Sequence, residues 1–110
     1  MPAYIYIYCP SGEEGLYRGI LEAELEDFFG TSAELCGGGG GVKGFNIDFE
    51  LADGEDLEAW VERLKSFLSN IGVRPSTFFT VHPDNWEPGM PWRRVEVFGM
   101  DRWLTETETK

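Results

Sequence analysis

The chain has 110 residues, of which 42% are hydrophobic and 15% aromatic, a composition that fits one globular domain and excludes a disordered chain. Its net charge of −11, from 20 acidic and 9 basic residues, argues against nucleic acid and anionic membrane surfaces as partners. Two cysteines and one histidine exclude a disulfide framework and supply few metal ligands, so no metal or cofactor is expected. No apolar run reaches the roughly 18 residues of a membrane span. The first residues also lack a secretory signal, so we expect a cytoplasmic protein.

The first third of the chain predicts a strand followed by a helix. Residues 3–9 alternate between tyrosine and smaller apolar residues, which is typical of a strand. Ser11 and Glu14 have the spacing of a capping box, which predicts the start of a helix there. That helix is expected to end near Phe29, because Gly30 is a natural stop.

The middle of the chain contains an unbroken run of glycines at 37–41. Residues 31–36 form a short strand candidate, and we expect the glycines to be a flexible loop that leads to a strand at 45–51. The run does not match a phosphate-binding loop, because Lys43 is followed by Gly44 and no helix comes next. An anion held between Lys43 and Arg74 remains an open alternative.

The second half of the chain predicts a helix and two strands. Asp53 is the expected cap of the helix, and apolar residues then recur at intervals of three and four from Leu57 to Ile71. Trp60 lies in the middle of this stripe. Strands are expected at 77–82 and 93–98, separated by a proline-rich loop. We therefore expect one domain over 1–110, with a core at about 3–82 and a Trp/Arg-rich extension at 83–110.

The order of elements over residues 3–82, β-α-β-β-α-β, resembles the ferredoxin-like split βαβ fold. This resemblance implies an α+β domain with a four-stranded antiparallel sheet in the spatial order 4-1-3-2. Two helices would cover one face, and a short C-terminal strand would follow. The architecture serves many functions and implies no activity by itself.

In that arrangement strands 3–9 and 45–51 are neighbours, and their alternation assigns each residue to a face. Ile5, Ile7, Ile47 and Phe49 are expected under the helices. Aromatic and polar side chains are expected together on the other face: Tyr4, Tyr6, Tyr8, Asn46, Asp48 and Glu50. Tyrosines on an uncovered face favour a recognition surface. The alternatives are that the C-terminal segment or a second copy of the chain covers it.

The C-terminal segment combines tryptophan with arginine, the composition of interaction hot spots. Its residues are Trp86, Trp92, Arg93, Arg94, Arg102 and Trp103. Either they contact a partner, or the tryptophans fold back on the sheet while the arginines pair with the carboxylates.

Few residues suit catalysis. Cys9 and Cys36 are expected at the ends of strands about 10 Å apart, too far for a disulfide. His82 is expected at the opposite end of the sheet from Cys9, so these residues form neither a dyad nor a metal site. His82 with Asp48 or Glu50 is the combination that would support an enzyme.

These observations favour a small, acidic, non-catalytic domain that binds a basic protein through Tyr4, Tyr6, Tyr8, Asn46, Asp48, Glu50, Trp86, Trp92, Arg93 and Arg94. In size, charge and fold style the chain resembles small acidic bacterial immunity proteins, which implies an inhibitor of a basic partner. The alternatives are a dimeric ligand-binding or sensor domain, paired through the open sheet face, and a small enzyme that uses His82.

Overall fold

The computed structural model describes residues 3–83, 86–90, 92–99 and, as backbone, 101–104. Its elements in chain order are β1 (Ala3–Pro10), α1 (Arg18–Phe29), a short 3-10 turn (Gly30–Ser32), β2 (Ala33–Gly41), β3 (Gly44–Leu51), α2 (Leu57–Asn70), β4 (Phe78–His82), β5 (Trp92–Glu96) and β6 (Asp101–Leu104).

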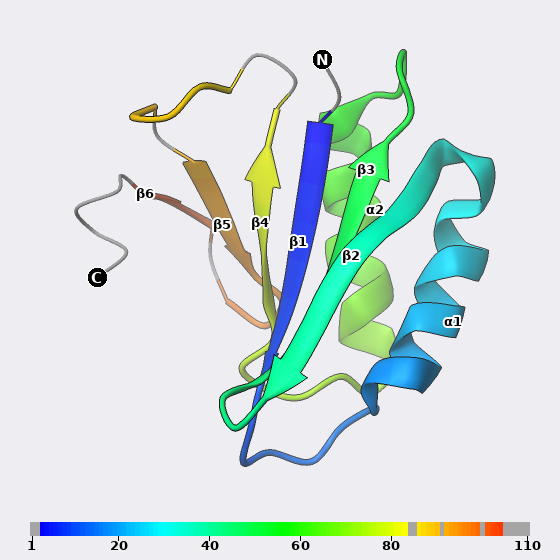
Figure 1. Cartoon of the computed structure of the whole chain (residues 1–110), viewed down its shortest axis with the longest axis vertical. Helices are drawn as coiled ribbons and strands as arrows, with labels where there is room; N and C mark the ends of the chain where they lie inside the picture. Colours follow the sequence, from blue (N-terminus) through cyan, green and yellow to red (C-terminus); the bar gives the residue numbers. More distant parts are fainter. Residues whose placement is uncertain (1–2, 84–85, 91, 100, 105–110) are drawn as a thin grey trace.

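The strands form one sheet in the order β2-β3-β1-β4-β5-β6, and all neighbouring strands are antiparallel. Both helices pack on the same face of it (Figure 1). The predicted α+β class and β-α-β-β-α-β order are confirmed. The predicted four-stranded sheet is too small, because β5 pairs with β4 and β6 pairs with β5. Neither helix of the described chain is long and apolar enough to cross a membrane.

The core lies between the sheet and the two helices. Ile5 is opposite Phe49 and Ile7 is opposite Ile47 in the β1–β3 ladder, and all four are fully buried. This confirms the face predicted from their alternation. The helices complete the core with apolar residues from one side of each: Leu21, Leu25, Phe29, Trp60, Val61, Leu64 and Leu68.

Both helices begin later than predicted. Ser11 does not cap α1, because its backbone N–H donates to Lys43 O and its hydroxyl donates to Val42 O. Tertiary partners thus take the groups that the capping box would have used, and α1 begins seven residues later, at Arg18. The cap of α2 is Asp56, whose carboxylate accepts from the Ala59 N–H at 3.2 Å, and not Asp53.

The glycine run is not a loop. Gly37–Gly41 continue β2 and pair with residues 48–44 of β3, so the connection shrinks to the turn at Val42 and Lys43. The register shifts between Leu35 and Gly37, which makes Cys36 the extra residue of a β-bulge. The loop prediction failed because glycine has no side chain to show a strand's period of two.

Candidate functional site

The candidate site is the sheet face opposite the helices, called here the open face. In the ladders Tyr4 is opposite Glu50, Tyr6 opposite Asp48, and Tyr8 opposite Asn46. All six side chains are half-buried, so the structure brings the predicted tyrosines and acidic residues together. Strands β4 and β5 continue the same face with Phe78, Thr80, His82, Trp92, Arg94 and Glu96.

Aromatic rings form two groups along β1 and β4, which together are called here the track. Tyr4 and Tyr6 are stacked with centroids 6.0 Å apart, and Tyr6 lies 4.9 Å from the ring of His82. Tyr8 stacks on Phe78 at 5.0 Å. Aromatic pairs at these separations stabilise one another beyond the area they bury. These contacts therefore help to hold the rings of the track in place.

Carboxylates run beside this track on β3. A hydrogen bond to Glu50 raises the pKa of the Tyr4 phenol, with partial burial as a second cause. Burial raises the pKa of Tyr6, and the neighbouring Asp48 adds to the shift. Asp48 also accepts a 2.8 Å hydrogen bond from the Asn46 amide. The phenols therefore stay protonated at neutral pH and can donate hydrogen bonds, while the carboxylates can attract cations.

Two residues of β2 extend the acidic side of the open face. Glu34 is directly opposite Glu50, which places like charges side by side. Cys36 at the bulge is exposed, and burial together with the charges of Asp48 and Glu50 raises the pKa of its thiol. The predicted site lacked both residues, because the bulge that aims Cys36 leaves no signal in the sequence.

The two arginines of β5 lie on opposite faces. Arg94 is on the open face, where its guanidinium covers the Phe78 ring at 3.6 Å and pairs with Glu96 at 3.0 Å. Arg93 is on the helix face and pairs with Glu58 of α2 at 2.6 Å. Consecutive strand residues point to opposite faces, so these two arginines cannot act as one cluster. Arg93 is thus not part of the open face, and its predicted role in binding through the C-terminal segment stays a prediction.

The tryptophans predicted as anchors gather around His82. The imidazole is 5.0 Å from both Trp86 and Trp92, and His82 is only 7% exposed. Burial lowers its pKa, so it is neutral near pH 7. Its Nε2 and the Trp92 Nε1 have no hydrogen-bond partner among the described residues. This supports the alternative that tryptophans fold back on the sheet at this corner. The side chains of Arg102 and Trp103 lie outside the described residues.

The residues of the alternative enzyme site, His82 with Asp48 or Glu50, share the open face but lie on strands that are not neighbours. His82 lies opposite Tyr4 in β4, and Glu50 lies on the far side of Tyr4 in β3. Two strand spacings, about 10 Å, therefore separate the backbones of His82 and Glu50. Cys9 is buried on the helix face, while His82 is on the open face at the other end of β1. Within the described residues, no group of three or more potential ligands could hold a metal ion.

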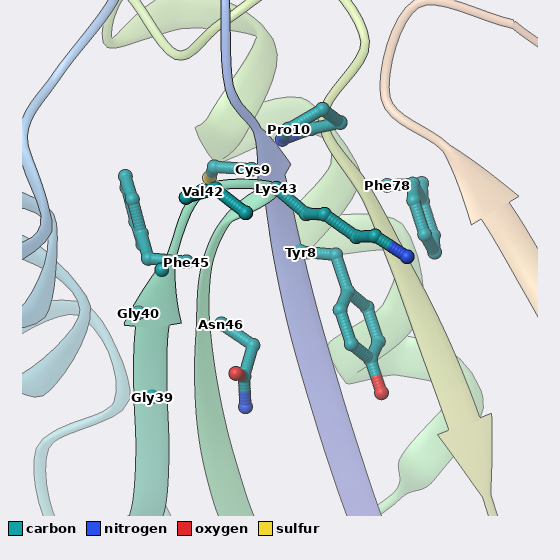
Figure 2. A pocket seen from close by; sticks show the side chains of 12 residues that line it. Tyr8, Cys9, Pro10, Gly39, Gly40, Val42, Lys43, Phe45, Asn46 and Phe78 are labelled. Carbon is teal, nitrogen blue, oxygen red and sulfur yellow. The ribbon is translucent and has the colours of Figure 1, made fainter.

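A hollow of about 530 Å³ lies at the hairpin end of the sheet, between the edge glycines and the Tyr8–Phe78 pair. Figure 2 shows Lys43 extending from the turn toward Phe78. Arg74 does not join it, because its guanidinium donates to the carbonyls of Cys9 and Pro10 and covers the Phe45 ring. Arg74 is therefore not part of the lining of the hollow, and an anion held between Lys43 and Arg74 stays a prediction.

The predicted strand 77–82 adds residues to the open face that the predicted site does not include. Its alternation places Phe78, Thr80 and His82 on one face, and that signal was sufficient to find Phe78.

Comparison with known proteins gives no match for this chain among family models, curated proteins or solved structures.

Proposed function

We propose that this protein is a non-catalytic binding domain whose open face contacts a basic region of a partner protein. The observation that carries the proposal is the pairing of three tyrosines with Glu50, Asp48 and Asn46 across β1 and β3. Tyrosine supplies contact area and hydrogen-bond donors, while the carboxylates supply charge complementarity. We also assign residues 3–82 to the ferredoxin-like architecture, extended here by β5 and β6.

The finer form of the proposal is an inhibitor of the immunity type. The net charge of −11 supports it, because an acidic surface accelerates association with a basic protein and blocks its anion-binding region. Aromatic residues on the open face would then determine how long the complex lasts. Arg94 does not oppose this, since its charge is paired with Glu96.

The test is capture from extracts of the source cells with immobilised protein, at low and high salt. Tyr6→Ala and Asp48→Lys should each lose the captured protein, and high salt should weaken capture by the wild type. Glu62→Lys is the matched control, because it makes the same charge change at an exposed position of α2. Equal capture by Asp48→Lys and the wild type would exclude the open face as the site.

A second candidate function is binding of a small ligand, which the hollow beside Tyr8 and Phe78 favours. Its volume of about 530 Å³ is within the usual range of ligand pockets. A screen of small aromatic acids by thermal shift tests it, because Lys43 and the free face of the Tyr8 ring would hold such a ligand. Stabilisation that survives Asp48→Lys but is lost in Lys43→Ala would favour this function over protein binding.

A further inference from the structure

The glycine edge, Gly37–Gly41, is the outer end of the outermost strand. β2 pairs with β3 on one side, and no strand of the described chain pairs with its other side. Figure 1 shows β2 at the end of the sheet away from β5 and β6, close to α1. A strand edge of this kind presents backbone N–H and C=O groups that an extended segment of another chain can bond.

The protein's own fold does not require most of these glycines. None of the five has a positive φ. A Cβ on Gly38 would press on Asn46 O and on the Arg18 guanidinium, but Gly37, Gly39 and Gly40 have room for one, and nothing lies within 4 Å at Gly41. Each glycine in a strand costs about 0.5–1 kcal/mol relative to alanine. Glycines in a strand that the packing of the fold does not require are typical of a place where another backbone approaches closely.

The charges around the glycine edge favour a basic segment as the strand that would pair with it. Gly37 is opposite Asp48, and Glu34 is opposite Glu50, so carboxylates line the open face beside the bare strand. Strands are about 4.8 Å apart, so a side chain on an added strand would stand about 10 Å from Asp48 with only Gly37 between them. A lysine or arginine side chain can extend across most of that distance, because Gly37 has no side chain in the way.

We propose that the glycine edge binds an extended segment of the partner as an additional strand, with basic side chains at alternate positions directed over Gly37 toward Asp48. This inference rests on the proposed function, and it adds the backbone geometry and the residue pattern of the partner. A second copy of this chain is the less favoured occupant, because it brings the same net charge of −11.

The test uses an eight-residue peptide of alternating lysine and threonine, titrated into the whole protein and followed by amide NMR. The peptide should shift the amide signals of residues 37–41. Two further peptides are N-methylated, one at its lysines and the other at its threonines. In an added strand, the N–H groups of the lysines and those of the threonines point to opposite sides. One of the two sets therefore bonds to β2, and the other points away from it. One methylated peptide should therefore bind at least about tenfold more weakly, while the other keeps most of the affinity.

Protein variants test whether a basic side chain of the peptide crosses over Gly37 to reach Asp48. Gly37→Val should weaken the unmethylated peptide at least about tenfold, because its side chain fills the space over the bare strand. Gly19→Ala is the matched control, since it changes a glycine of α1 that has no atoms near its Cβ position, and it should bind as the wild type does. The methylated peptides need no variant, so they test the proposal even if Gly37→Val folds poorly.

Three results would overturn the strand proposal. The first is equal binding of the two methylated peptides with loss in Asp48→Lys, which leaves the open face as the site. The second is no binding of the unmethylated peptide up to about 1 mM, in which case the capture experiment still decides the proposed function. The third is a concentration-dependent dimer that Gly37→Val dissociates, which would identify a second copy as the occupant.

Discussion

The imidazole of His82 and the indole of Trp86 meet edge to face, with ring centroids 5.0 Å apart and an angle of 87° between the planes. This contact, with Tyr6 and Trp92 on other sides, holds a titratable group in a nearly dry site. Burial lowers the pKa of this imidazole, so the protonation of His82 is coupled to the stability of the fold.

We predict that the unfolding free energy decreases as the pH falls below about 6.5. The pKa of His82 in the folded state is below its ordinary value of 6.5, because burial disfavours the charged form. At a pH between the lowered pKa of folded His82 and its ordinary value of 6.5, the unfolded chain binds more protons than the folded one. The unfolding free energy therefore rises with pH in this range, and the contribution of His82 reaches its full value above 6.5. Urea titrations across this range measure the effect.

His82→Phe is the companion variant to that pH series. It replaces an imidazole whose Nε2 has no partner among the described residues, so stability at pH 7 should not decrease and the slope near pH 6 should disappear. Glu13 and Glu55 also have lowered pKa values, but they titrate below their ordinary value of 4.5 and do not overlap this window. A wild type with constant stability from pH 5 to 7 would contradict the assignment.

We predict that Trp60→Ala lowers the unfolding free energy by about 3–5 kcal/mol. The indole packs against Phe28 and Phe29 at 5.5 and 5.3 Å, and its Nε1 donates to Glu55 at 2.8 Å. Its removal leaves a cavity between the helices and a carboxylate without its donor. Urea midpoints measure the loss, and Glu62→Ala at an exposed site of α2 should change stability by less than about 0.5 kcal/mol. An unchanged midpoint for Trp60→Ala would show that the ring is not part of the core.

We predict opposite effects for two glycines at the ends of the hairpin turn. Gly44 has a φ of 119°, and a Cβ there would overlap the backbone of Cys9 and Pro10. Gly44→Ala should therefore cost at least about 3 kcal/mol. Gly41→Ala should be neutral or stabilise by up to about 1 kcal/mol, because its Cβ meets no atom within 4 Å. Thermal unfolding of both variants decides this, and equal losses would mean that the turn differs from the one described.

We predict that a thiol reagent modifies one cysteine of the native protein and reaches the second only after unfolding. Cys36 is exposed, whereas Cys9 is buried and its sulfur accepts from the Thr77 hydroxyl at 3.6 Å. Cys36 should react slowly at pH 7 and faster at higher pH, because burial and the charges of Asp48 and Glu50 raise its pKa above 9.0. Cys36→Ser should abolish the native reaction. Two thiols that react at the same rate would place Cys9 at the surface.

Alternation along the chain is enough to assign each residue of β1 and β3 to a face of the sheet. Side chains in a strand alternate strictly, so once Ile5, Ile7, Ile47 and Phe49 are buried, Tyr6 and Asp48 must share the other face. The buried face of α2, which includes Trp60, could also be predicted from the sequence, because apolar residues at intervals of three and four lie on one side of a helix. The order of elements and the positions of β1, β3 and β4 followed from such periodic segments, whereas the extent of β2 did not.

Tertiary structure alone decided the features without such a period. Glycine carries no side-chain pattern, so only pairing with β3 shows that Gly37–Gly41 form a strand. Ser11 could cap a helix, but the hairpin turn offers Val42 and Lys43 as stronger partners at long range. In both cases the deciding contact joins one segment to another, and the pattern of a single segment does not contain it.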